Sequence, residues 1–154
     1  MVLWATLFLA SVLGTEAFAY VMHRYVMHGP GWFLHKSHHE PRHNHLEWND
    51  VFHLVFAIPS VVWIYFGLRG HPWQLPIGIG MAVYGLANWA FHDVLVHRRL
   101  RHSWLPRRGY LRRIVQAHHI HHRARTRDGA ESFGFFWAPD YSTREARAAA
   151  RHAS

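Results

Sequence analysis

The sequence contains no cysteine, and this absence limits both its covalent cross-links and its metal chemistry. Disulfides and thiolate ligands are excluded, so any metal must be bound by nitrogen and oxygen atoms, which disfavours iron–sulfur clusters and structural zinc fingers. Acidic residues are also few, with 9 Asp and Glu against 17 Lys and Arg, and the net charge is +8. Such a charge can indicate nucleic-acid binding, but the distribution of the basic residues argues against it.

Lys and Arg are absent from three long stretches, residues 1–23, 43–68 and 70–97. These contain apolar runs at about 2–22, 51–68 and 73–91, and about 20 such residues suffice to cross a bilayer. The first run resembles a signal peptide, but it lacks a positive n-region and the first histidine pair follows it at once, so we interpret it as a retained span. Pro59 is tolerated as a kink in the second run. Glycines in the third allow close helix contact, namely Gly78, Gly80 and Gly85.

The basic residues also predict the orientation of these spans. The connection at 69–72 carries one Arg, whereas 23–50 and 92–127 carry most of the positive charge. The positive-inside rule places both of the latter in the cytoplasm, where the dense Arg residues at 98–127 attract anionic lipid headgroups. We therefore expect one all-α integral membrane domain, 1–154, with three to four transmembrane helices and cytoplasmic interfacial helices. Its His-rich cap comprises 23–50 and 92–139, and its tail, 140–154, contains a helix start at Ser142 or Thr143 with Glu145.

Histidine is abundant, and ten of the 17 residues occur in an order that is repeated. Each set reads His-x4-His followed by His-x2-His-His. The first set is His23, His28, His35, His38 and His39, and the second is His92, His97, His118, His121 and His122. Imidazole suits zinc, copper, iron and nickel, and packing alone does not account for the repeat. We predict that all ten bind a centre of about two metal ions built from both halves of the chain.

The spacing of these histidines has different consequences in the two motifs. On an α-helix, His-x2-His-His places its rings at about 0°, 300° and 40°, an arc that can face one metal or bridge two. The members of His-x4-His lie about 140° apart, too wide for one helical face. Either the helix loosens where it leaves the membrane, or each member binds a different ion.

A helix from about Gly109 is predicted to carry the second triad on its apolar stripe. With Leu111 at zero, the three histidines fall at about 340°, 280° and 20°. His119 falls at about 80°, on the side of the arginines, and is expected to be solvated. The remaining histidines are interpreted as interfacial polar residues: His43, His45, His53, His71, His102 and His152.

A neutral imidazole ligand needs an acceptor for its second nitrogen. Four acids near the motifs are candidates, Glu40, Glu47, Asp50 and Asp93, and Asp93 is preferred because it adjoins His92. Glu16 is the one acid in the first span, roughly 10 Å along a helix from His23. It either supports a ligand or is a hydrogen-bonded carboxyl group near the interface.

Taken together, the motifs resemble those of bacterial beta-carotene 3-hydroxylases, members of the membrane fatty acid hydroxylase and sterol desaturase superfamily. The resemblance extends from about residue 15 to Pro139 and rests on His23-x4-His28, Gly29-Pro30, His35-Lys36-Ser37-His38-His39-Glu40, Leu46-Glu47 with Asn49-Asp50, His92-Asp93-x3-His97, Pro106-Arg107, Gln116-Ala117-His118, His121-His122 and Ser132-Phe133-Gly134-Phe135. His53 and His119 are additional to that pattern.

The resemblance implies a membrane di-iron monooxygenase of the bacterial inner membrane, with the ten histidines as its iron ligands on the cytoplasmic side. It implies O2 and reduced ferredoxin as co-substrates and hydroxylation of C3 of the β-ionone ring, giving zeaxanthin through β-cryptoxanthin. Zinc is an alternative occupant after purification. Phe133, Phe135 and Trp137 are either a lid over the carotenoid pocket or interfacial anchors.

Three other functions remain open on the sequence alone, one of which is an interaction scaffold whose histidines are structural. Within the same chemistry, the chain could be a related lipid hydroxylase, ketolase or desaturase. In another class, it could bind or transport metal, although the spans offer chiefly Glu16, Gln74 and Asn88 as polar groups for a path. The pattern does not indicate an oligomeric state.

Overall fold

The computed structural model describes residues 1–40 and 46–141, and this part of the chain is helical without β-strands. Its α-helices are α1 (Val2–Val21), α2 (Trp32–His39), α3 (Val51–Leu68), α4 (Leu75–Asn88) and α5 (Gly109–His121). Two π-helices, η1 (Met22–Met27) and η4 (Trp89–Val96), continue α1 and α4. Two 3-10 turns, Trp48–Asp50 and Pro72–Gln74, precede α3 and α4. His43, His45, His152 and the predicted tail helix from Ser142 lie outside the described residues.

Three helices are long and apolar enough to cross a membrane: Val2–Met27, Trp48–Leu68 and Pro72–Val96. They contain the three predicted apolar runs. Much of their apolar surface faces outward, as Leu13, Val61 and Leu86 illustrate with exposures of 71%, 64% and 67%. A surface of this kind fits hydrocarbon rather than water. The chain is thus an all-α membrane protein, as predicted.

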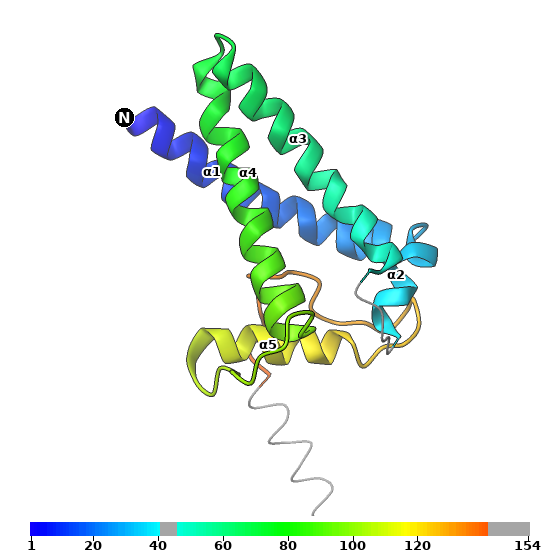
Figure 1. Ribbon diagram of the computed structural model, residues 1–154. Coiled ribbons are helices and arrows are strands. Elements are labelled where there is room, and N and C mark those ends of the chain that lie inside the picture. Colours follow the sequence, from blue (N-terminus) through cyan, green and yellow to red (C-terminus); the bar gives the residue numbers. More distant parts are fainter. Residues whose placement is uncertain (41–45, 142–154) are drawn as a thin grey trace, which may run out of the picture.

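α4 is the central span, and it packs against α3 on one side and α1 on the other (Figure 1). Small residues allow both contacts, because a Cβ at Gly78 would lie 2.8 Å from the Ser60 carbonyl oxygen, and one at Gly80 would lie 2.8 Å from that of Phe8. The Ser60 hydroxyl donates to the Gly78 carbonyl oxygen at 2.9 Å. The predicted close approach is therefore confirmed at Gly78 and Gly80, whereas an added Cβ at Gly85 meets nothing within 4 Å.

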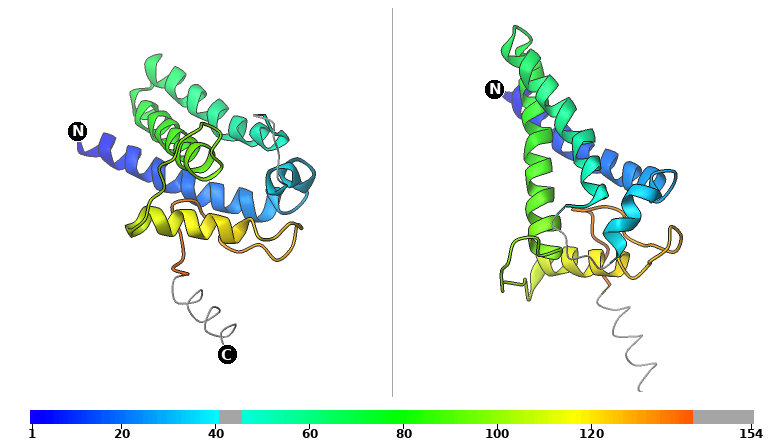
Figure 2. Two further views of the ribbon diagram at one scale, coloured as in Figure 1. Left: turned by 60° about the horizontal axis from the view of Figure 1, so that its bottom comes forward. Right: turned by 45° about the vertical axis from the view of Figure 1, so that its right-hand side comes forward.

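α5 crosses the ends of the spans that lie farthest from the α3–α4 turn (Figures 1 and 2). Its buried face carries Ile114, Val115 and Ala117. These residues pack against Leu95 and Val96 at the end of η4, and against the segment that follows α5. Residues 122–141 then return under the spans, and their backbone carbonyl groups at Ala124, Arg127, Glu131 and Phe133 contact histidines of the spans, α2 and α5.

Candidate metal centre

Both His-x4-His pairs lie where an α-helical span changes into a π-helix. The His28 amide donates to the His23 carbonyl oxygen at 3.0 Å, and the His97 amide donates to that of His92 at 2.9 Å. This i to i+5 bond widens the turn and brings the two members of each pair onto one face. Their ring centroids are 5.3 Å apart in the first pair and 4.7 Å apart in the second. The first alternative from the sequence, a loosened helix at the membrane exit, is confirmed.

The ten histidines form two clusters of five, in each of which one nitrogen from every residue lies within 4.8 Å of the others. Cluster A comprises His23, His28, His35, His39 and His121, and cluster B comprises His38, His92, His97, His118 and His122. Both members of each His-x4-His pair belong to one cluster. This grouping favours one shared ion for each pair over the second alternative, in which the two members serve different ions.

The two His-x2-His-His triads connect the clusters. On α2, His35 and His39 are one turn apart and enter cluster A, while His38 points to cluster B. On α5 the assignment is reversed, since His118 and His122 enter cluster B and His121 enters cluster A. Each cluster thus takes four histidines from one half of the chain and one from the other, so neither half contains a complete cluster.

Burial lowers the pKa of several cluster histidines below physiological pH. Loss of hydration lowers the pKa of His39 to about 4. Loss of hydration, together with neighbouring histidines, lowers the pKa of His97 and that of His121 to about 2. The pKa of His38 and that of His118 are likewise held well below the usual value, first by burial and then by the other rings. Neutral imidazole is the form that binds metal.

The Nδ1 atoms fix which nitrogen of each ring carries the proton. In cluster A, backbone carbonyl oxygens accept from four Nδ1 atoms, with distances of 2.9, 3.0, 2.8 and 2.9 Å for His23, His28, His39 and His121. The fifth, His35 Nδ1, lies 2.7 Å from Asn49 Oδ1. Because a carbonyl oxygen can only accept, Nδ1 holds the proton and Nε2 presents a lone pair.

Those Nε2 lone pairs face one another inside the clusters. His23 Nε2 lies 3.2 Å from His35 Nε2, and His28 Nε2 lies 3.1 Å from His121 Nε2. In cluster B, His38 Nε2 lies 3.0 Å from His92 Nε2, while His122 Nε2 is buried with no hydrogen-bond partner among the described residues. Lone pairs this close repel unless a cation lies between them. The donor set therefore fits two metal ions bound through nitrogen.

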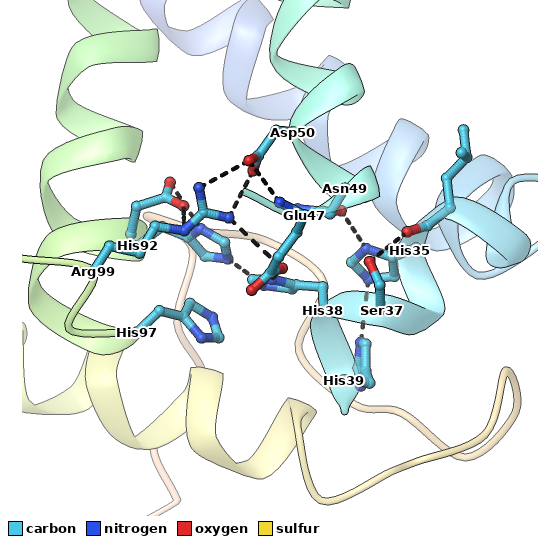
Figure 3. Close-up of polar contacts among 12 residues, drawn as sticks. His35, Ser37, His38, His39, Glu47, Asn49, Asp50, His92, His97 and Arg99 are labelled. Atoms are coloured by element: carbon cyan, nitrogen blue, oxygen red, sulfur yellow. Dashed lines mark hydrogen bonds and ion pairs between the residues drawn. The ribbon is translucent and has the colours of Figure 1, made fainter. Parts of the chain in front are cut away.

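Acidic residues support cluster B (Figure 3). Glu47 Oε2 accepts from His38 Nδ1 at 2.8 Å, and Asp93 Oδ2 accepts from His92 Nδ1 at 3.3 Å. Of the four predicted acids, these two contact a motif histidine. Glu40 instead pairs with Lys36 at the surface, and Asp50 binds Arg99.

Glu16 contacts the site indirectly. Its Oε2 accepts from the Tyr84 hydroxyl at 2.8 Å, and its Oε1 accepts from the Phe135 and Trp137 amides at 3.0 and 2.9 Å. The segment that it fixes includes Phe133, whose carbonyl oxygen accepts from His23. The Glu16 carboxylate thus fixes the segment around Phe133–Trp137, and this segment in turn orients His23. None of these hydrogen bonds joins Glu16 directly to an imidazole.

Histidines outside the clusters differ in their surroundings. His119 is exposed, as its position on the helical wheel predicted, and His71 is exposed in the turn between α3 and α4. His102 donates from Nε2 to the Val94 carbonyl oxygen at 2.7 Å. His53 was predicted to be an interfacial polar residue, but its Nε2 lies 3.4 Å from Oδ2 of Asp93, the acid that also contacts His92.

A cavity of about 440 Å³ extends from the clusters into the space between α1, α3 and α4. Its inner end is formed by two histidines from each cluster: His23, His35, His92 and His118. Its walls are mainly apolar and include Phe52, Phe56, Ile64, Met81, Gly85, Phe133 and Phe135. Val61 and Leu86 also line it and are exposed on the span surface, which indicates a mouth toward the bilayer. A cavity of this size and polarity suits an apolar ligand.

Comparison with known proteins agrees with this geometry. Residues 8–142 match the family model described as Fatty acid hydroxylase. The chain belongs to the fatty acid hydroxylase family. It is 45% identical over 149 residues to a beta-carotene hydroxylase of Pantoea ananas, covering 96% of this chain and 85% of that protein. It is 50% identical over 129 residues to a beta-carotene hydroxylase of Pseudescherichia vulneris, covering 83% of this chain and 73% of that one.

A third bacterial relative, a beta-carotene hydroxylase of Paracoccus sp. (strain N81106 / MBIC 01143), is 48% identical over 131 residues, 84% of this chain and 81% of its own. No solved structure matches the chain significantly. The predicted resemblance to this hydroxylase family is confirmed, and membership makes the chain an enzyme of the hydroxylase class.

Several contributors to the site were not predicted from the sequence. Asn49 is one, although it lies in the Leu46–Asp50 motif between two acids that were considered. Arg99 is another, since its Nε lies 2.9 Å from Asp93 Oδ1. The carbonyl groups of Ala124, Arg127, Glu131 and Phe133 could not be found, because every residue carries one.

Proposed function

We propose that this protein is a di-iron carotenoid 3-hydroxylase that converts β-carotene through β-cryptoxanthin to zeaxanthin. The observation that carries the proposal is the apolar cavity, which extends between the spans and ends on both histidine clusters. The bacterial relatives named beta-carotene hydroxylase support a carotenoid as its ligand.

The ten clustered histidines are proposed to hold two iron ions, five to each cluster. Their Nε2 lone pairs are the donors, and Nδ1 acceptors orient each ring. Bound iron, with O2 and electrons from reduced ferredoxin, would supply the oxidation of an unactivated C–H bond, which redox-inert zinc cannot.

The residues of the chain bind and orient the substrate in this proposal. A β-ionone ring that enters from the bilayer is held by the aromatic and aliphatic walls, which also exclude water. Phe133 and Phe135 place their rings at the inner end of the cavity, beside His23 and His92. This contact favours the lid over the interfacial anchor for these two residues, whereas Trp137 is 75% exposed and fits an anchor.

Pigment analysis of a host that accumulates β-carotene tests the proposal. Expression of the chain is expected to give products heavier by 16 and 32 mass units, with the hydroxyl groups at C3. The His38→Ala variant is expected to give none, and His119→Ala, which changes an exposed ring outside the clusters, is the matched control. Unchanged β-carotene in the presence of expressed, iron-loaded protein contradicts the proposal.

The same experiment separates the alternatives. A ketolase adds 14 mass units and a desaturase removes 2. Metal transport predicts uptake into proteoliposomes, but the ten histidines gather at one end of the spans, and Glu16 is occupied by Tyr84 and two backbone amides. The geometry therefore favours an enzyme over a metal path.

A further inference from the structure

The two clusters have the same number of histidines but differ in what holds those histidines. In cluster A, every Nδ1 atom donates to an uncharged oxygen. The five acceptors are the carbonyl oxygens of Phe133, Arg127, Ala124 and Glu131 and the amide oxygen of Asn49.

In cluster B, two of the histidines donate to carboxylates. His38 donates to the carboxylate of Glu47 at 2.8 Å, and His92 donates to that of Asp93 at 3.3 Å. Among the ten clustered histidines, the two with a carboxylate recorded at Nδ1 are thus both in cluster B. The two histidine sets therefore have the same spacing in the sequence, but their Nδ1 atoms contact acceptors of different charge.

Arg99 does not cancel this charge. It pairs with Asp93 at 2.9 Å and with Asp50 at 2.6 Å, and it lies 3.6 Å from Glu47 (Figure 3). Three carboxylates surround this one guanidinium, so its single positive charge does not neutralise all of them; His53 also contacts Asp93. Asp93 is fully buried, where water screens its charge little.

We infer that the two metal positions are unequal and that cluster B binds its divalent ion more tightly than cluster A. A carboxylate that accepts from Nδ1 raises the basicity of the metal-binding Nε2, and negative charge near a dication stabilises it. Glu47 and Asp93 act as positioning residues through His38 and His92. The inference rests on the proposed function, because it requires two ions in one protein.

Release of Fe(II) from the anaerobic, iron-loaded full-length protein to a chromogenic chelator tests the inference. Wild type is expected to release its two ions in two phases of equal amplitude, with rates about 10–100-fold apart, the usual effect of a supporting carboxylate. His121→Ala, which changes cluster A, is expected to remove the fast phase. His122→Ala, the matched variant in cluster B, is expected to remove the slow phase.

Two near-isosteric substitutions separate charge from structure. Glu47→Gln keeps a side chain that can cap the turn at Trp48–Asp50 while removing the charge, and it is expected to accelerate the slow phase by about 10-fold. Asn49→Asp adds a carboxylate behind His35 and is expected to slow the fast phase, so that the two phases converge. A purely structural role predicts that both variants accelerate release.

Release of both ions in a single phase from wild type overturns the inference and leaves the proposed function intact. A slow phase unchanged in Glu47→Gln, or a fast phase made faster by Asn49→Asp, overturns it as well. Protein that binds fewer than two iron ions overturns both the inference and the di-iron function.

Discussion

Individual imidazoles couple the folding of this protein to pH. His39 has a pKa of about 4 in the folded state because burial removes its hydration, against 6.5 when unfolded. Between these values the unfolded chain binds a proton that the folded chain does not, so acid favours unfolding. The stability contributed by a neutral buried histidine is complete above about pH 6.5 and declines as pH falls toward the folded value.

We therefore expect metal-free protein in detergent to lose stability steadily below pH 6.5, measured by chemical denaturation between pH 8 and 4.5. Each such histidine contributes a slope of about 1.4 kcal/mol per pH unit. His39→Asn should reduce the slope by about that amount. A free energy of unfolding that stays constant over this range would contradict the burial of neutral rings.

Glu16 gives a second prediction for a single residue. Glu16→Gln keeps an oxygen that can accept from the Phe135 and Trp137 amides, so iron content and turnover should change less than threefold. Glu16→Ala leaves these amides without their acceptor and should lower the free energy of unfolding by about 1–3 kcal/mol. Thermal unfolding and iron analysis of both variants test this. Loss of turnover in Glu16→Gln with unchanged iron content would instead assign the carboxylate a direct role.

At the scale of helices, the glycines of α4 divide into packing and cavity positions. Gly85→Leu projects into the cavity without meeting backbone, so the fold should persist while carotenoid conversion falls at least 10-fold. Gly80→Leu on the same helix would meet the Phe8 carbonyl oxygen and Ser11, and it should destabilise the α1–α4 contact. Melting temperature and product yield, measured on both variants, distinguish the two effects. Equal loss of stability in both would place Gly85 in the packing rather than the cavity.

Much at this scale follows from local sequence pattern. The apolar runs predicted the three spans, and the 100° periodicity predicted the buried face of α5 and the exposure of His119. The grouping of the histidines into clusters A and B could not be predicted from the sequence pattern. It depends on two π-helices, and an inserted residue in a helix has no signature apart from the His-x4-His spacing, which left two alternatives open.

Contacts between distant parts of the chain were the least predictable. Glu16 and the two amides that donate to it are 119 and 121 residues apart, and His39 and Ala124 are 85 apart. Nothing in a single sequence links such positions, and a backbone carbonyl is common to every residue. The side chain of Glu47 was a candidate, but its assignment to His38 required the turn at Trp48–Asp50.

For the whole molecule, the arrangement of charge predicts its orientation in the membrane. We propose that the outer turn with Arg69 faces away from the cytoplasm and that α5 faces the cytoplasm. Because the chain has no cysteine, single-cysteine variants report one position each. Arg69→Cys should react with a membrane-impermeant thiol reagent in intact cells, and Arg112→Cys, also exposed, should react only after permeabilisation. The opposite pattern would reverse the orientation.

Each cluster takes one histidine from the other half of the chain, and this arrangement sets an order for the assembly of the protein. Cluster A needs His121 and four carbonyl groups between Ala124 and Phe133, so it is incomplete until the chain has been synthesised through Phe133. The three spans precede this segment and can enter the bilayer first. Under the proposed function, metal loading of cluster A would then follow membrane insertion, and a chain that ends before His121 would retain the three spans without a complete cluster A.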